Sequence, residues 1–176
     1  YSNGKLQDVL KGVGLDSRIG SHYFRPSPSW GGSCFPKDLV EVNNFYDNNL
    51  ISLPLISNIL SSNYEHLIWT SNIIIKLFRE HNLENIILIG AAFKEDTDDL
   101  RNSPTIDLYN SLKSQNWNVQ ILDTTLSLKD MQQLTNVSDI NENSLIVYMY
   151  PPKEDLEEQI NSYIENKNCY IYYPWK

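Results

Sequence analysis

Cysteines and long apolar runs are both scarce in this sequence, and each shortage limits what the protein can be. The 176 residues include only two cysteines, Cys34 and Cys169, which lie far apart in the chain. Two distant cysteines do not form a disulfide framework, and free thiols are typical of the reducing cytoplasm in which we expect the protein. The apolar runs at 73–77 and 86–92 are much shorter than the roughly 20 residues that a membrane helix needs, so no transmembrane segment is predicted.

Basic residues are also few. The chain has 14 Lys and Arg against 22 Asp and Glu, which gives a net charge of -8. A broad nucleic-acid or anionic-membrane surface needs a basic footprint, so we expect neither partner. Any phosphate-bearing ligand must therefore be held by a few placed cations. His22, His66 and His81 have no metal-ligand spacing with one another or with the cysteines, so no metal site is expected.

The first half of the sequence has helical patterns. Residues 6–13 predict a short helix, 37–46 a second one, and 54–81 a long amphipathic helix whose first residue is Pro54. Between the first two, residues 16–32 are broken by Gly, Pro and Ser, as loops are. The chain begins without an initiator Met or a signal peptide, as a fragment of a longer protein would.

The second half alternates between apolar runs and helical patterns. The expected strands are Ile86–Ile89, Val119–Leu122, Leu145–Met149 and Tyr170–Tyr173. Such alternation is typical of an α/β fold with a doubly wound parallel sheet, which we place at 85–176 after a helical segment at 1–84. Ser103 is expected to cap a helix that begins at Pro104 and continues to about residue 113.

Cys34 is the first candidate for chemistry. It follows Gly31 and Gly32 in the segment 30–38, and paired glycines let a backbone approach a ligand. The expected helix start after it, with Lys37 nearby, would lower the pKa of the thiol and favour the reactive thiolate. Asp38 would lie about one helical turn away and could order a water molecule. A lone cysteine is often a small buried apolar residue, and the residues alone leave both interpretations open.

A second candidate segment runs from Gly90 to Pro104, after the first expected strand. Ligands of such sheets bind at the carboxyl ends of strands, where Lys94 and Arg101 could hold phosphate oxygens. An ordinary solvated loop is the alternative. Because Gly90 stands alone, the dinucleotide fingerprint G-x-G-x-x-G is absent, and we do not expect NAD to bind in this domain.

Two further groups carry weaker signals. Residues 16–26 supply Arg18 and Arg25 shortly before Cys34, although they could form an ordinary surface loop. Aromatic residues near the C-terminus are expected to pack against strands rather than to bind a ligand. They are Tyr148, Tyr150, Tyr170, Tyr172, Tyr173 and Trp175.

Three segments, in this order and spacing, resemble one family. RIG at 18–20, GGSCFPKD at 31–38 and FKEDTDDLRNSP at 93–104 are similar to motifs of the UDP-glucose/GDP-mannose dehydrogenases. The resemblance covers about residues 4–123 and is weak beyond. Residues 23–26, 53–55 and 59–63 favour the GDP-mannose branch. Ser27 replaces a usual Gly, and Asn102 replaces a usual acid.

The resemblance implies an enzyme that oxidises the C6 alcohol of a nucleotide sugar to a carboxylate and reduces two NAD. Cys34 would form a thiohemiacetal and then a thioester, which water cleaves with help from Asp38. Lys37 would contact the cofactor. The nucleotide sugar would be bound by Arg18, Tyr23, Arg25, Trp30, Gly31, Phe93, Lys94 and Arg101.

The same resemblance implies a larger assembly. Residues 1–84 would be part of a helical central domain that forms a homodimer, and 85–176 a Rossmann-like domain that binds the nucleotide sugar. The family's N-terminal NAD domain, and a Lys and an Asn of its central helix, are not in this sequence, so we expect this chain alone to be inactive. Alternatives are a nucleotide-sugar-binding or regulatory module without redox activity, and a helical dimerisation unit with degenerate loops.

Overall fold

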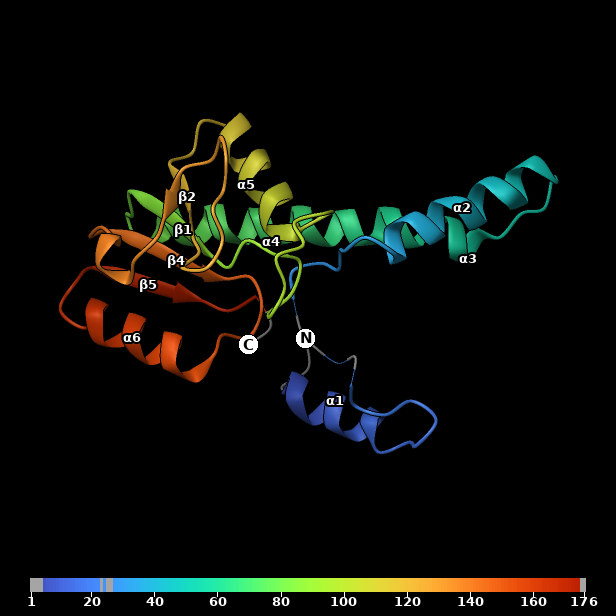
Figure 1. Ribbon diagram of the computed structural model, residues 1–176, viewed down its shortest axis with the longest axis horizontal. Coiled ribbons are helices and arrows are strands. Elements are labelled where there is room, and N and C mark those ends of the chain that lie inside the picture. Colours follow the sequence, from blue (N-terminus) through green and yellow to red (C-terminus); the bar gives the residue numbers. More distant parts are fainter. Residues whose placement is uncertain (1–4, 23, 25–26, 175–176) are drawn as a thin grey trace.

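The computed structural model describes residues 5–22, 24 and 27–174, which form a helical arm joined to a sheet domain (Figure 1). The arm contains α2 (Phe35–Asn48), α3 (Pro54–Ser57) and the start of α4 (Ile59–Glu80). The rest of α4 runs into the sheet domain and packs there, while α1 (Leu6–Gly14) stands apart from both. One long helix therefore joins the two parts.

The predicted parallel sheet is confirmed, and it has five strands in the order β3-β2-β1-β4-β5. The strands are β1 (Asn85–Ile89), β2 (Val119–Leu122), β3 (Gln133–Leu134), β4 (Ser144–Tyr148) and β5 (Cys169–Tyr172). The helices of this domain are α5 (Pro104–Ser114), α6 (Glu154–Ile164) and the short 3-10 helix η1 (Val137–Asp139). The sequence did not indicate β3, because a strand of two residues has no recognisable periodicity.

Alternate residues of the central strands point to opposite faces of the sheet, as the two-residue period of a strand requires. Ile86 and Leu88 of β1 belong to a core cluster that includes Ile74 of α4 and Leu108 of α5. Ile87 and Ile89 belong to a second cluster, which includes Ile160 and Ile164 of α6. The sheet is therefore covered by helices on both faces, and every residue of β1 and β4 is buried.

The predicted helix 54–81 is divided, which corrects that prediction. α3 ends at Ser57, and Asn58 lies between α3 and α4. The Asn58 side chain donates a hydrogen bond to the Pro54 carbonyl at 2.7 Å, and the Ser57 hydroxyl donates to Leu53. Asn and Ser side chains compete in this way with the helical backbone, which explains the break.

Ser103 does not cap α5 with its side chain, contrary to the prediction. It occupies the N-cap position, but its hydroxyl donates a 2.6 Å hydrogen bond to the carbonyl of Ala91. Ser103 is buried there, in contact with the loop that follows β1. The hydroxyl therefore connects two loops at the carboxyl edge of the sheet.

Within the described part of the chain, no helix is both long and apolar enough to cross a membrane.

Candidate active site

The loop that carries Cys34 lies directly on the loops that follow β1. A Cβ atom on Gly31 would overlap the carbonyl oxygen of Asn102 and lie 3.1 Å from Cδ of Pro104. Gly32 has φ +98, and a Cβ there would lie 3.0 Å from the ring of Phe93. The paired glycines thus allow one loop to approach another, and this contact brings Cys34 to the carboxyl edge of the sheet.

The base of the Cys34 loop is fixed by α4. The Asn63 side chain accepts a 3.0 Å hydrogen bond from the Trp30 amide and donates a 2.9 Å bond to the Trp30 carbonyl. The Trp30 ring meets Phe35, the first residue of α2, edge to face at 4.6 Å between centroids. Asn63 belongs to the segment 59–63 noted in the sequence, but its contact with Trp30 was not indicated, because the two residues lie 33 positions apart.

Cys34 is exposed and occupies the N-cap position of α2, as the sequence predicted for a thiol at a helix start. Its sulfur lies 3.7 Å from the Ser33 hydroxyl. Asp38 lies one turn along the helix, where its amide donates a 2.9 Å hydrogen bond to the Cys34 carbonyl. The Lys37 ammonium lies 3.9 Å from the Asp38 carboxylate, and both side chains are exposed. The thiol is therefore exposed, and Ser33 is its side-chain neighbour among the described residues.

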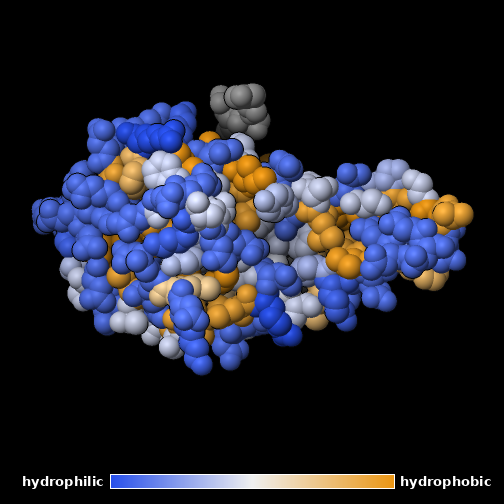
Figure 2. Space-filling view, turned by 90° about the horizontal axis from the view of Figure 1, so that it is seen from above, coloured by the Kyte–Doolittle hydropathy of each residue, from blue (hydrophilic) through white to orange (hydrophobic). Residues whose placement is uncertain are grey.

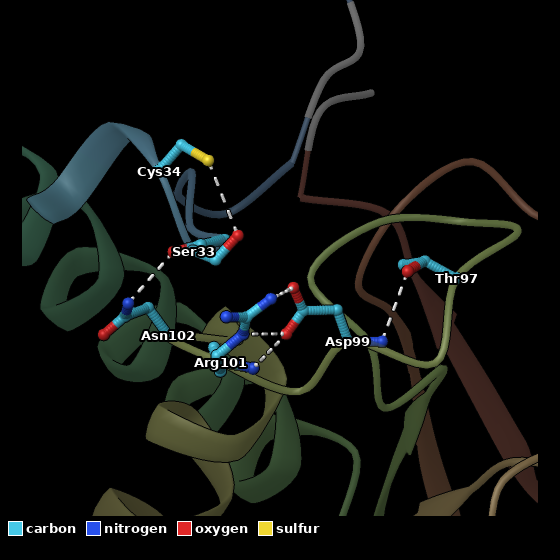
Figure 3. Close-up of polar contacts among 7 residues, drawn as sticks. Ser33, Cys34, Thr97, Asp99, Arg101 and Asn102 are labelled. Atoms are coloured by element: carbon cyan, nitrogen blue, oxygen red, sulfur yellow. Dashed lines mark hydrogen bonds and ion pairs between the residues drawn. The ribbon is translucent and has the colours of Figure 1, made fainter. Parts of the chain in front are cut away.

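An ion pair faces the Cys34 loop from the sheet domain. The guanidinium of Arg101 donates two hydrogen bonds to Asp99, at 2.9 Å from Nε and 2.7 Å from Nη2. Figure 3 places Ser33 between Cys34 and this pair. The segment is therefore a charged loop that is closed by its own side chains, with the Arg101 side chain exposed.

Each member of this ion pair shifts the pKa of the other. The Arg101 guanidinium and amide lower the pKa of Asp99 from 3.8 to about 2, and the Ser33 hydroxyl contributes less. The pKa of Arg101 is raised in turn, mainly by Asp99 and to a smaller extent by Cys34. Asp99 therefore remains a carboxylate throughout the neutral pH range, and it holds the exposed Arg101 guanidinium beside it.

A cavity of about 170 Å³ lies beside this contact. It brings together four of the residues that the sequence singled out, Trp30, Gly31, Phe93 and Lys94. Its remaining lining residues are Ser27, Glu95, Tyr150 and Pro151. The Lys94 ammonium lies 5.4 Å from the centroid of the Phe93 ring, so the cavity combines aromatic side chains with a nearby cation. Such a pair suits a base or sugar joined to a phosphate.

Tyr150 packs against the core, as predicted for the late aromatics, and it also lines the cavity. Its phenol covers Gly90, where a Cβ would lie 2.9 Å from Cε1. Burial raises the pKa of Tyr150 to about 12, with further contributions from Asp123, Glu95 and Asp96. The phenol therefore keeps its proton at neutral pH. The sequence did hold a signal for this position, because Tyr150 follows a buried strand by two residues, and ligands of such sheets bind at the ends of strands.

A larger hollow of about 510 Å³ lies between α4 and α5. It is lined partly by Tyr64, Ile68, Ser71 and Asp107, and burial raises the pKa of Asp107. None of the residues predicted to bind or react lies in it. The predicted residues therefore lie at the smaller of these two cavities.

The described sheet domain does not fit NAD. In a dinucleotide fold, glycines after the first strand admit the pyrophosphate, and an acid after the second strand binds ribose hydroxyls. Here Tyr150 covers Gly90, and the buried carboxylate of Asp123 already accepts hydrogen bonds from Ala91, Thr125 and Leu126 at 2.9 to 3.0 Å. The described residues also hold no His, Cys, Asp and Glu cluster suited to a metal.

The remaining predicted site residues lie elsewhere. Arg18 is exposed and paired with Asp16 through Nε at 3.0 Å and Nη2 at 2.6 Å. It belongs to the turn after α1, which lies apart from the sheet domain in Figure 1. Tyr23 and Arg25 fall outside the described residues. The predicted roles of these three residues in substrate binding stay predictions.

Two family models match this chain in the same order as these parts of the fold. Residues 3–65 match the central domain of the UDP-glucose/GDP-mannose dehydrogenase family, and residues 87–163 match its UDP binding domain. The chain belongs to the UDP-glucose/GDP-mannose dehydrogenase family. The motifs at Cys34 and Phe93–Lys94 thus fall in two domains of one dehydrogenase family, and the structure brings those motifs into contact.

Individual dehydrogenases agree with this family assignment. The UDP-glucose 6-dehydrogenase of Rickettsia felis is 36% identical over 124 residues, which cover 68% of this chain and 27% of that protein. A UDP-glucose dehydrogenase structure from Pyrobaculum islandicum has 26% identity and a TM-score of 0.66, with 81% of this chain and 35% of that chain covered. The GDP-mannose dehydrogenase of Pseudomonas aeruginosa has 20% identity and a TM-score of 0.68, with 95% and 41% covered. At that identity the last comparison concerns the fold alone. The chain spans about a quarter of the length of curated relatives such as two Rickettsia UDP-glucose 6-dehydrogenases that are 36% identical to it.

Proposed function

We propose that this chain is part of an NAD-dependent nucleotide-sugar 6-dehydrogenase, an enzyme that oxidises the C6 alcohol of the sugar to a carboxylate. The observation that carries the proposal is the contact between the Cys34 loop and the cavity formed by Phe93 and Lys94. A nucleophile and a nucleotide-binding cavity at one sheet edge suit a substrate whose reactive carbon lies some distance from its base.

We propose that residues 1–84 form part of a central helical domain with the thiol loop, and that 85–176 bind the nucleotide sugar. NAD would be bound mainly by a domain outside this chain, since the described sheet does not fit it. This chain alone would then bind substrate without oxidising it.

In this proposal Lys94 holds a phosphate oxygen of the substrate, while Phe93 and Trp30 contact its base or sugar. The cavity of about 170 Å³ is smaller than the roughly 300–1,000 Å³ of typical ligand pockets, so it would hold one part of the substrate. The remainder would extend along Gly31 toward Cys34. Arg101, held by Asp99, would supply a second positive charge on this path.

The chemistry proposed for Cys34 concerns the aldehyde-level intermediate. NAD would accept the hydrides when bound. The Cys34 thiolate adds to the C6 carbon, whose oxygen takes up a proton to give a thiohemiacetal. After the second oxidation the sugar is held as a thioester, and water attacks it, which releases the carboxylate and returns the thiol. Asp38, one helical turn from Cys34, would orient this water, and Lys37 would lie on the side of the cofactor.

We further propose a homodimer formed through the central helices. Figure 2 shows apolar side chains gathered on the arm. Among the exposed apolar residues of α2, α3 and the loop between them are Phe45, Leu50, Ile51 and Leu55, which are between 47% and 95% exposed. Apolar surface of this extent favours association. Arg18, Tyr23 and Arg25 would then contact the substrate of the other subunit. Sedimentation equilibrium of this chain should give twice the mass of one chain, and a monomer at micromolar concentrations would contradict the dimer.

The substrate is proposed to be a uridine diphosphate sugar, because the matching domain model and the 36% identical relative both concern UDP compounds. The preference for GDP-mannose inferred from residues 23–26, 53–55 and 59–63 stays a prediction. Calorimetric titration of this chain with UDP-glucose and GDP-mannose separates the two.

Titration also tests the cavity itself. Replacing Lys94 by Met removes the cation, and because a charge-assisted hydrogen bond contributes about 1.5–3 kcal/mol, affinity should fall roughly tenfold or more. Lys76→Met is the matched control, because Lys76 lies on α4 away from the cavity and pairs there with Glu80. This variant should bind the nucleotide sugar as the parent chain does. Equal affinity in both variants would contradict the site.

The alternative functions are separated by the full-length protein. Binding without NADH formation would favour a binding or regulatory module, and no binding at all would favour a dimerisation unit with degenerate loops.

A further inference from the structure

Asn102 makes a side-chain contact that joins the sheet domain to the thiol loop. Its amide nitrogen donates a 2.9 Å hydrogen bond to the carbonyl of Gly32, two residues before Cys34 (Figure 3). The backbone carbonyl oxygen of Asn102 is the atom that a Cβ on Gly31 would overlap. Both glycines of the thiol loop therefore contact the same residue.

The nucleotide side of the cavity holds the same loop from a second direction. Gly32 is buried, and the ring of Phe93 covers the position of its missing side chain. Phe93 also lines the cavity. A ligand that packs against Phe93 would therefore touch a ring that itself contacts Gly32. The carbonyl of Gly32 accepts the hydrogen bond from Asn102.

Asn102 is well placed to fix this loop because its own backbone is anchored. It has φ +50, a left-handed conformation that Asn adopts more readily than most residues. The turn around it closes through a 3.2 Å bond from the Ser103 amide to Leu100, and α5 begins directly afterwards. α5 is held in the core by Leu108 and Leu112, which are fully buried. The thiol loop, with two adjacent glycines, has more conformational freedom.

We propose that Asn102 is a positioning residue that couples the occupancy of the Phe93 cavity to the placement of the Cys34 thiol. This inference rests on the proposed function, in that the cavity must bind a nucleotide. Asn102 itself touches no reacting atom. Its role is to make the nucleotide loop and the thiol loop move as one unit.

The decisive variant is Asn102→Asp, which keeps the size of the side chain and tolerates positive φ. A carboxylate cannot donate a hydrogen bond, and it places a negative charge against the Gly32 carbonyl. Asn116→Asp is the matched control, because Asn116 is also exposed, has φ +65 and lies just beyond the end of α5. Asn102→Gly is a second test variant, which keeps the backbone conformation and removes the donor without adding charge.

The measurement is the rate at which iodoacetamide alkylates Cys34, with and without saturating UDP. All variants carry Cys169→Ser, so that Cys34 is the single thiol of the chain. Calorimetry gives the affinity for UDP in parallel, and thermal unfolding reports whether each variant is folded.

In the parent chain UDP should change the alkylation rate at least about fivefold, since one hydrogen bond corresponds to roughly that factor. In Asn102→Asp and Asn102→Gly the change should fall below about twofold while UDP affinity stays within about threefold. Asn116→Asp should behave as the parent. A UDP effect that persists in both Asn102 variants, or a parent that binds UDP without any change in alkylation, would overturn the inference. A parent that binds no UDP would refute the proposed nucleotide site on which the inference depends.

Discussion

Replacing Cys34 by Ser is expected to lower NADH formation from a nucleotide sugar by the full-length enzyme at least about a thousandfold, as loss of a covalent nucleophile does in other enzymes. A hydroxyl at neutral pH is far less nucleophilic than a thiol, which is partly ionised there. The change is nearly isosteric at an exposed N-cap position, where Ser is itself a favoured residue, so the fold should be unaffected.

The control for this variant is Cys169→Ser. Cys169 lies in β5 and its thiol contacts the Asn141 carbonyl at 3.6 Å, so its replacement should leave turnover unchanged. Nucleotide-sugar binding should survive in Cys34→Ser, because the cavity at Phe93 is intact. Normal turnover in Cys34→Ser would show that the thiol is not the nucleophile and would remove the mechanistic part of the proposed function.

Replacing Gly31 by Ala is expected to have the second largest effect, although it adds a single methyl group. The new Cβ would overlap the Asn102 carbonyl oxygen and lie 3.0 Å from its carbon, and a backbone group cannot rotate away. The thiol loop must therefore separate from the sheet domain. A displacement of about 1 Å at a reacting group can cost roughly a hundredfold in rate, so turnover by the full-length enzyme should fall by that order.

Gly12→Ala is the matched control for Gly31→Ala. Gly12 lies within α1, and a Cβ there would meet nothing within 4 Å. Because Ala is favoured over Gly inside a helix by about 0.5–1 kcal/mol, this variant should be as stable as the parent or slightly more so. If Gly31→Ala matched the parent in turnover and in substrate affinity, the close contact between the two loops would not be required for function.

Much of the fold could be predicted from the sequence because its strands are short buried apolar runs. Ile86–Ile89, Val119–Leu122, Leu145–Met149 and Tyr170–Tyr173 all overlap observed strands, and their alternation with helices implied a parallel sheet. The prediction was wrong where local side-chain bonds decided the outcome. Asn58 divides the long helix, and Ser103 binds the Ala91 carbonyl instead of capping α5.

Residue type and spacing alone singled out Cys34 at a helix start, Asp38 one turn later, and Lys94 in a loop after a strand. Those features depend on neighbours in sequence, which is why the chain itself determined them. Only the tertiary structure decided that Gly31 and Gly32 face Asn102 and Phe93, that Asn63 holds Trp30, and that Tyr150 lines the cavity. These contacts join residues more than 30 positions apart, and no local propensity specifies them. They exist because the sheet and α4 bury their apolar faces together, which places the thiol loop against the nucleotide loop.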